Sequence, residues 1–244
     1  MTRSLAAVFV VLTFCQAFAA NPPSDSADER YKARGAVMEL YNQRKFAEAL
    51  PLALQAVAID EKALGPNDLD FAKDLNLLGL LYHQLRHYAE AASSYKRSLA
   101  IREKELRPDH PDVAQSLSNL GLLYIAESRY AEAEPLLERA LAIRVKAFNA
   151  DHPDIGLWLR NVANVYAKEG RCADAEPLYQ HALQIFERAF GPDHPDVEWA
   201  LRNLAALYKS EGRDSEAEPL YKRAAAIREK LQRDRLQGSQ APQF

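Results

Sequence analysis

The stretch Leu117-Ser-Asn-Leu-Gly-Leu-Leu-Tyr124 decides the fold of this chain of 244 residues, because its pattern recurs along the chain at a constant spacing. Two of its positions hold one residue type in four consecutive units, and a third such position follows nine residues later. These columns are Leu75, Leu117, Leu159 and Leu201; Tyr82, Tyr124, Tyr166 and Tyr208; and Ala91, Ala133, Ala175 and Ala217. The period read from these numbers is 42. Self-similarity at a fixed period of this length indicates a protein built from stacked structural repeats.

Shifting the chain by one period aligns it with itself without a gap and sets the boundaries of the units. The four full units are 65–106, 107–148, 149–190 and 191–231. A shorter unit near 31–64 precedes them, because its Phe46-Ala-Glu-Ala49 and Pro51 lie two periods before Tyr130-Ala-Glu-Ala133 and Pro135. We therefore expect the repeats to fill residues 31–231.

Each unit contains two apolar patterns with the spacing of one helix face. In the unit 107–148, the first pattern consists of Val113, Leu117, Leu120, Gly121 and Tyr124. After the short segment 127–129, the second consists of Ala133, Leu137, Ala140, Leu141 and Phe148. The small residues Gly121 and Ala133 would let the two helices approach closely. The sequence thus predicts an all-α protein made of antiparallel helix pairs.

The segment Asp109-His-Pro-Asp112 carries signals for the start of a helix: an N-cap acceptor, a proline near the first helical position and an acid in the first turn. His-Pro-Asp recurs at His110, His152 and His194. The same tripeptide is the working motif of J-domain cochaperones, but its recurrence at the joints between units indicates helix capping here.

A proline also recurs early in the second helix of four units, at Pro51, Pro135, Pro177 and Pro219. Proline removes a backbone hydrogen bond inside a helix. The second helix therefore either begins after this residue or bends at it.

Together with Tyr130-Ala-Glu-Ala-Glu-Pro-Leu136 and Arg139-Ala-Leu-Ala-Ile-Arg144, these patterns resemble tetratricopeptide repeats, and the period of 42 is similar to that of the kinesin-light-chain subtype. The resemblance implies a right-handed superhelical solenoid of about five helix pairs. In such a solenoid the first helices line a concave groove that binds proteins or peptides. Motor function does not carry over, because a heptad segment before the repeats is missing and the N-terminus has the features of an export signal.

That N-terminal segment has Arg3 followed by an uncharged run of seventeen residues, and it ends in Ala17-Phe-Ala19. Small residues at these positions are typical of cleavage after Ala19, so residues 1–19 are predicted to be a secretory signal peptide and the protein to be periplasmic or secreted. An uncleaved anchor is the alternative, because the run lies at the lower limit of a membrane span. Residues 20–30 are expected to form a flexible lead and residues 232–244 a flexible tail, with no stable membrane insertion after cleavage.

Composition excludes several classes of protein. The formal net charge is −3, with 31 Lys and Arg against 34 Asp and Glu, which argues against a nucleic-acid-binding tail. Two cysteines, Cys15 and Cys172, are too few for a disulfide framework or a four-thiolate zinc site, and Cys172 is the only thiol left after signal cleavage. We expect no cofactor.

Candidate chemistry outside the groove is weak. His83 and His87 lie four residues apart and could chelate a metal, but no third ligand is apparent, so a structural role is favoured. Cys172 would lie at a helix N-terminus, yet its column also holds Tyr88 and Tyr130, which indicates a tolerant surface position. Nucleophile-elbow, zincin, Walker and dinucleotide motifs are absent from the sequence. The sequence therefore predicts a protein that is not an enzyme.

The resemblance places the columns of Gln115, Ser118, Asn119, Leu122, Ile125 and Ala126 on the concave face. Across the five units these thirty positions hold six cations and no Asp or Glu. The cations are Arg34, Lys73, Arg160, Lys168, Arg202 and Lys209. One-sided charge of this kind would concentrate positive potential in the groove. The alternative is that these side chains only solvate an exposed surface.

The same columns contain asparagines, which can donate to and accept from the main chain of an extended peptide. They are Asn119, Asn161 and Asn203 in one column, with Asn76 and Asn164 in two others. Tyr31, Tyr41 and Trp199 add aromatic surface near the two ends. The alternative for the asparagines is a ladder of hydrogen bonds between neighbouring helices.

These observations predict a non-enzymatic scaffold whose groove binds an extended peptide, with acidic side chains or a free carboxylate favoured. The alternative is a structural, self-assembling subunit of an envelope complex, in which exposed end repeats form homo-oligomers. It depends on the segment Tyr31–Met38, whose apolar residues look incompletely capped.

Overall fold

The structure is a computed structural model that describes residues 26–148 and 152–238. Over these ranges it consists of ten α-helices, with no β-strand. The first helix of each unit is α2 (Ser26–Asn42), α4 (Leu69–Gln84), α6 (Pro111–Ala126), α8 (Pro153–Lys168) or α10 (Pro195–Ser210). The second helix is α3 (Phe46–Leu64), α5 (Tyr88–Glu105), α7 (Tyr130–Ala147), α9 (Cys172–Phe190) or α11 (Asp214–Gly238). The predicted all-α solenoid of helix pairs is confirmed.

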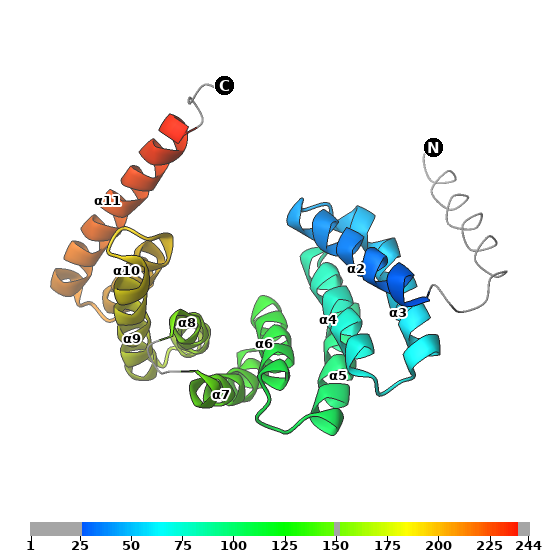
Figure 1. Cartoon of the computed structure of the whole chain (residues 1–244). Helices are drawn as coiled ribbons and strands as arrows, with labels where there is room; N and C mark the ends of the chain where they lie inside the picture. Colours follow the sequence, from blue (N-terminus) through cyan, green and yellow to red (C-terminus); the bar gives the residue numbers. More distant parts are fainter. Residues whose placement is uncertain (1–25, 149–151, 239–244) are drawn as a thin grey trace, which may run out of the picture.

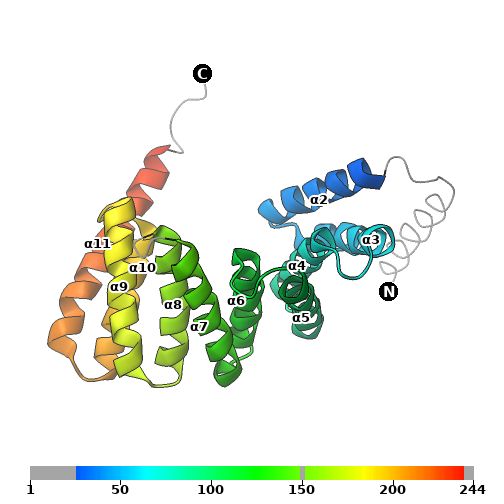
Figure 2. The same cartoon turned by 60° about the horizontal axis from the view of Figure 1, so that its bottom comes forward.

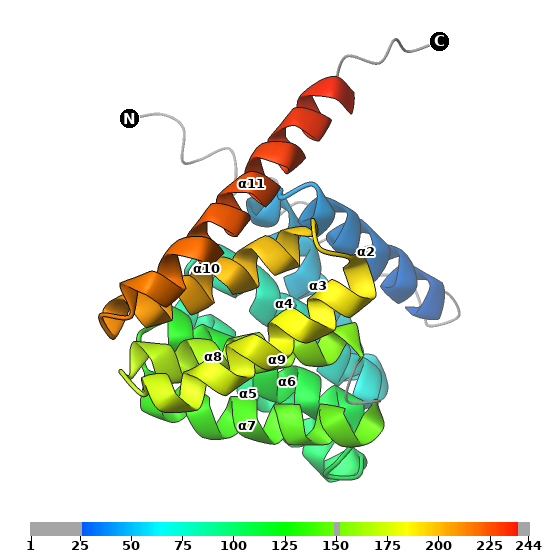
Figure 3. The same ribbon diagram turned by 90° about the vertical axis from the view of Figure 1, so that its left-hand side faces the viewer.

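The pairs follow one another around an open arc, with α2 at one end and α11 at the other (Figure 1). First helices such as α4, α6 and α8 lie on the inner side of the arc, and second helices such as α5, α7 and α9 lie on the outer side. Figure 2 shows the same succession from below, and in Figure 3 the pairs are stacked behind one another with α11 in front. We call the inner side, made by the first helices, the inner face.

The predicted capping role of His-Pro-Asp is confirmed. The imidazole Nδ1 of His110 accepts a hydrogen bond from the backbone N–H of Asp112 at 3.1 Å, and His152 and His194 do the same in α8 and α10. In α4 the cap is Asp68, whose carboxylate accepts from the N–H of Asp70 at 2.7 Å. Each proline of the motif occupies the first turn, where a missing N–H costs nothing.

A left-handed residue ends the first helix of each unit. It is Arg44, Arg86, Ser128, Gly170 or Gly212, and the φ angles lie between 59° and 76°. The N–H of the next residue then bonds a carbonyl five residues earlier, as Arg129 does with Tyr124 at 2.8 Å. This arrangement satisfies a backbone group at the helix end and reverses the chain. The turn therefore sets the antiparallel pairing within every unit.

The second helices pass through their prolines. The helices α3, α7, α9 and α11 each begin five residues before the recurring proline and continue beyond it. The proposal that these helices begin after the proline is therefore wrong. Proline is tolerated here because it lies just beyond the first turn, where only one helical hydrogen bond is lost.

Two expected boundaries also change. Helix α2 begins at Ser26, so residues 26–30 of the expected flexible lead are helical. Helix α11 continues to Gly238, because the expected tail opens with good helix formers such as Gln232 and Arg233. The predicted signal peptide 1–19, with Cys15, and residues 20–25 and 239–244 lie outside the described residues.

Close approach of the paired helices depends on small residues, as the sequence predicted for Gly121. A Cβ atom added at Gly121 would lie 2.7 Å from Leu137 Cγ, and one added at Gly156 would lie 2.6 Å from the ring of Phe186. Phe186 in turn packs in a buried cluster with Leu159 and Leu201, which come from two consecutive units. The apolar core is therefore shared between neighbouring units, as in other solenoids.

Arginine side chains connect the last three units near their turns. Arg129, Arg171 and Arg213 lie over the rings of Tyr124, Tyr166 and Tyr208 at 4.2, 4.2 and 4.0 Å. Two of them also reach the preceding unit, since Arg171 pairs with Glu134 at 2.5 Å and Arg213 with Glu176 at 2.7 Å. The column continues in the second unit with His87, which stacks on Tyr82 at 6.0 Å. The same position thus stabilises successive turns with an arginine or with an imidazole.

Candidate functional site

The inner face begins at α2 with an arginine that connects three helices. Arg34 Nε donates to Asp74 Oδ1 in α4 at 2.5 Å, and its Nη2 lies 3.4 Å from Asp60 Oδ2 in α3 and 3.3 Å from the carbonyl oxygen of Asp70. The side chains of Asp60 and Asp74 are only 1% and 3% exposed. Burial lowers the pKa of Arg34, but the hydrogen bond to Asp74 and the charges of Asp74, Asp70 and Asp60 outweigh it and raise the pKa overall. Arg34 therefore has a structural role, because it connects the first unit to the second at their contact.

The next inner cation is also paired. Lys73 Nζ lies 2.8 Å from Asp70 Oδ1 within α4. On the same helix, burial lowers the pKa of His83, which favours the neutral imidazole. His83 contacts the ring of Tyr88, and no group of three potential metal ligands occurs in the part of the chain that the structure describes. The α2 and α4 part of the inner face is therefore balanced in charge by its own residues.

A ladder of amide groups crosses the middle of the inner face. Gln115 Nε2 donates to Asn119 Oδ1 at 3.1 Å, and Asn119 Nδ2 donates to Asn76 Oδ1 at 2.8 Å in the preceding unit. Asn119 is almost fully buried, as are its neighbours Ser116 and Ser118. For Asn76 and Asn119 the structure thus shows the hydrogen-bond ladder that was the alternative to a ligand contact.

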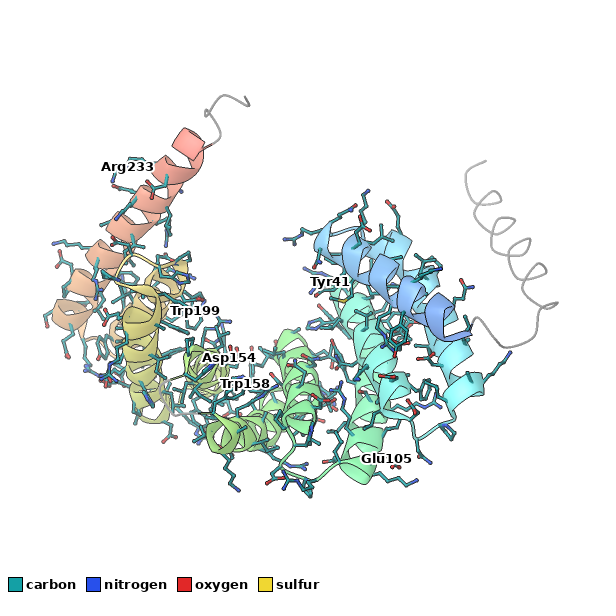
Figure 4. All side chains as sticks on the ribbon, viewed as in Figure 1. Tyr41, Glu105, Asp154, Trp158, Trp199 and Arg233 are labelled. Carbon is teal, nitrogen blue, oxygen red and sulfur yellow. The ribbon has the colours of Figure 1, made fainter. Side chains whose placement is uncertain are left out.

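Arg160 is the central cation of α8. Its guanidinium lies 4.9 Å from the ring centroid of Trp199 in α10, and its Nη1 lies 3.4 Å from Asp196 Oδ1. Burial lowers the pKa of Arg160, and the charge of Asp196 acts in the opposite direction. Trp199 lies on the inner side of α10, across from Trp158 and Asp154 of α8 (Figure 4). The aromatic ring therefore fixes the orientation of a guanidinium that has donors left over, because arginine has five N–H groups.

The asparagines of α8 and α10 differ in their availability. Asn164 Oδ1 accepts from the hydroxyl of Tyr179 at 2.8 Å, and Asn203 Nδ2 donates to the carbonyl oxygen of Trp199 at 2.8 Å. Burial raises the pKa of Tyr179, so its hydroxyl stays protonated as a donor. Asn161 is half-buried and makes no side-chain hydrogen bond with any described residue. Asn161 is thus the asparagine whose amide is available to a ligand.

The remaining inner cations are only loosely paired or unpaired. Arg202 Nε lies 3.8 Å from Glu198 Oε1, which is too long for a hydrogen bond, and Glu198 is also held by Arg228 of α11. Lys168 and Lys209 are exposed and have no ion-pair partner within residues 26–148 and 152–238. These three side chains lie on α8 and α10.

The ion pairs of the inner cations correct the expectation of a continuous positive charge along the inner face. The thirty positions hold no acid, but acids from adjacent columns lie within 4 Å of four of the six cations. These acids are Asp70, Asp74, Asp196 and Glu198. Positive charge is therefore not spread along the whole face. Of the six cations, the two without an ion-pair partner among the described residues are Lys168 of α8 and Lys209 of α10. A binding role for the six cations and the five asparagines of the inner face stays a prediction.

Two buried acids were missed by the sequence reasoning. The column of Asp60 otherwise holds Arg102, Arg144, Phe186 and Arg228, and the column of Asp74 otherwise holds Lys32, Ser116, Trp158 and Ala200. The available signal was that each acid lies in a column with no other acid.

Cys172 is half-buried, and its Sγ lies 3.8 Å from Ser210 Oγ, which adds no group that would activate a thiol. None of the described helices has the combined length and apolar character needed to span a membrane.

Comparison with known proteins supports the repeat architecture. A family model described as tetratricopeptide repeat matches residues 36–104, 75–146, 112–174 and 154–230. The crystal structure of nearly identical TPR-like repeats attributed to a kinesin light chain of Podosopora anserina is 27% identical, with a TM-score of 0.71, and the match covers 87% of this chain and 99% of that chain. No curated protein sequence matches the chain.

Two further solved structures share the fold at lower identity. BtubC (BKLC) from P. vanneervenii is 20% identical, with a TM-score of 0.71, over 86% of this chain and 90% of that chain. A Rap protein crystallised in complex with Competence and Sporulation Factor is 20% identical, with a TM-score of 0.66, over 84% of this chain and 55% of that chain.

Proposed function

Because the chain belongs to the tetratricopeptide repeat family, we propose that it is a non-catalytic scaffold that binds a segment of another protein on its inner face. The fold is typical of protein–protein interaction, and members of this family are typically scaffolds without enzymatic activity. A structural neighbour, the Rap protein, was crystallised with a bound factor, which supports ligand binding as a use of this architecture.

The observation that carries the proposal is the contrast between the inner and outer sides. On the outer helices, ion pairs connect successive units, as in Arg97 with Glu61 at 2.5 Å, Arg223 with Glu187 at 2.6 Å and Arg139 with Glu103. On the inner face, Lys168, Lys209 and Asn161 are left without such partners among the described residues. Polar groups that the fold does not use are available to a ligand.

These groups favour a peptide that carries acidic side chains or a free carboxylate. The amide of Asn161 can donate to and accept from peptide main chain. Lys168 and Lys209 carry point charges on flexible side chains, and these charges attract carboxylates over a distance of about 8–10 Å at ordinary salt. The ligand would therefore be held by main-chain hydrogen bonds and selected by charge.

A bulky side chain placed on the inner face tests the proposal. Ala206 in α10 lies in the inner column of Leu122 and is exposed, and Ala142 in α7 is an equally exposed alanine on an outer helix. A partner captured from native extract and identified by mass spectrometry should bind Ala206→Trp at least about tenfold more weakly, a change of ~1.4 kcal/mol. Ala142→Trp is the matched control and should bind as the wild type does. Equal binding by both variants, with unchanged circular dichroism, would exclude the inner face.

The two ends of the solenoid favour this proposal over end-to-end assembly. In later units the column of Ser116 packs against the preceding unit, but in α2 it holds the exposed Lys32. At the other end, the column of Phe186 holds the exposed Arg228. Charged residues at joining positions are the caps that solenoids need for solubility. A mass that rises with concentration in light scattering would instead support a structural assembly.

Export is part of the proposal and is supported by the sequence of residues 1–19 alone. Protein purified from the source cells should begin at Ala20 or Asn21 and fractionate as a soluble periplasmic or secreted protein. N-terminal sequencing checks this directly. An intact Met1 in carbonate-washed membranes would support the uncleaved anchor.

A further inference from the structure

We propose that the inner face binds its peptide in one direction, with the acidic part of the peptide on α8 and α10 and an uncharged apolar part on α2 and α4. This inference rests on the proposed function, since it specifies how the same face is used. The occupant is one extended segment of a partner protein whose acidic residues are grouped at one end.

At the α2 and α4 end, both inner cations are already paired with acids of the protein. Its inner cations are Arg34 and Lys73, and the acids around them are Asp60, Asp70 and Asp74. Each of these cations thus has an acid within ion-pair distance, and two of the acids are buried beneath Arg34. A ligand carboxylate at this end would have to compete with Asp74 for a guanidinium that already donates to it at 2.5 Å. Such competition disfavours an acidic segment at this end.

The same end exposes apolar surface instead. Tyr31 is 59% exposed and Met38 is 44% exposed, and both lie in columns that belong to the inner face. Tyr41 follows three residues after Met38, so the three side chains share one face of α2. Figure 4 places Tyr41 at the end of α2 that points into the arc. Large apolar side chains gathered on one exposed face mark a contact site for another apolar surface.

At the α8 and α10 end, the inner cations outnumber the acids that pair with them. Four inner cations, Arg160, Lys168, Arg202 and Lys209, face two acids, and one of these acids, Glu198, is shared with Arg228. Arg160 is already oriented by the ring of Trp199, so little side-chain entropy would be lost when it binds an anion. Lys168 follows Arg160 by eight residues, which is about 12 Å along a helix. An extended peptide covers that distance in about four residues.

Between the two ends, α6 presents no charge to the ligand. Its inner positions include the half-buried Gln115, which donates to the buried Asn119, and the half-buried Leu122. The inner face therefore changes along the arc from apolar and charge-balanced, through neutral, to cationic. A ligand with the complementary gradient gains contacts in one direction only.

A spin-labelled peptide tests the direction. The probe is a synthetic peptide of about sixteen residues, long enough to follow five first helices when extended. One half consists of Leu, Ala and Ser and the other of Glu, Ser and Gly, and a nitroxide is attached at either end in two separate preparations. With the ¹⁵N-labelled full chain, a nitroxide at the acidic end should broaden amide signals of α8 and α10, and a nitroxide at the apolar end should broaden those of α2. Reversed broadening, or no broadening at millimolar peptide, would overturn the inference.

Matched neutralisations provide a second measurement. Lys168→Gln combined with Lys209→Gln should weaken binding of this peptide about tenfold and reduce its salt dependence. Lys73→Gln removes the same kind of charge at the α4 end and should change the affinity less than twofold. Equal effects of the two sets would contradict the direction. If both labels broaden all first helices equally, the inner face still binds and only the direction fails; if they broaden outer helices, the proposed function fails as well.

Discussion

The junction between the first two units and the junction between the last two units place different chemistry at the same two positions of the repeat. At the first junction these positions hold Asp60 and Asp74, both buried and both within reach of Arg34. At the last junction they hold Phe186 and Ala200, which belong to one buried apolar cluster. The backbone packing is the same kind in both. The comparison shows that the repeat sets the geometry of a junction and leaves its chemistry free.

At the two middle junctions, an arginine occupies the first of these positions and makes a polar or cation–π contact with the second. Arg102 donates to Ser116 Oγ at 2.9 Å, and Arg144 lies 5.1 Å from the ring of Trp158. Along the chain the junctions therefore change from an ion cluster, through a hydrogen bond and a cation–π contact, to apolar packing. The ion cluster uses the inner cations of α2 and α4, whereas apolar packing leaves those of α8 and α10 for a ligand.

The largest effect is expected at the apolar junction. Phe186→Ala should lower the free energy of unfolding by ~3–5 kcal/mol, because the ring is fully buried and joins two units. Phe190→Ala in the same helix is the control and should cost less than about 1 kcal/mol, since Phe190 is exposed. Urea denaturation followed by circular dichroism measures both. Similar losses for the two variants would mean that this junction is not packed as described.

A somewhat smaller effect is expected at the ion cluster. Arg34→Met should cost ~3 kcal/mol, because it leaves the buried carboxylate of Asp74 without its guanidinium. Adding Asp74→Ala should restore most of the loss, since the last junction carries alanine at this position. The same urea titration compares the single and double variants. A second substitution that lowers stability further would show that Asp74 does not depend on Arg34.

The smallest effect concerns the turns, which also differ between the two halves. The left-handed residue is Arg44, Arg86 or Ser128 in the first three units and glycine in the last two. Ser128→Gly should stabilise the protein and Gly170→Ala should destabilise it, each by about 1 kcal/mol. A Cβ atom at Gly170 would meet no other atom within 4 Å, so the effect isolates the backbone conformation.

A helical glycine provides the control for these turn variants. Gly35 in α2 also has open space around it, but its φ is not positive, so Gly35→Ala should stabilise by about 0.5–1 kcal/mol. Thermal denaturation ranks the three variants. Stabilisation by both Gly170→Ala and Gly35→Ala would show that the turn is not held in the left-handed conformation.

The sequence predicted the repeat period, the helix pairs, the histidine caps and the close approach at Gly121, because these depend on local patterns that recur from unit to unit. It did not predict which inner cations are paired. Arg34 and Asp74 lie 40 residues apart, and their contact depends on how far a side chain reaches between two helices. The burial of Asn119 was missed for the same reason, since its amide partners are Gln115 and, from another unit, Asn76.

The central claim is that the inner face of the solenoid is the binding site. Hydrogen exchange of the free and the partner-bound protein tests this claim most directly. Peptide-level exchange measured by mass spectrometry separates first from second helices, because turns divide them. Binding of a captured partner should slow amide exchange in α8 and α10 and leave the outer helices α7 and α9 unchanged. Slower exchange in α7 and α9 with no change in the first helices would contradict the account.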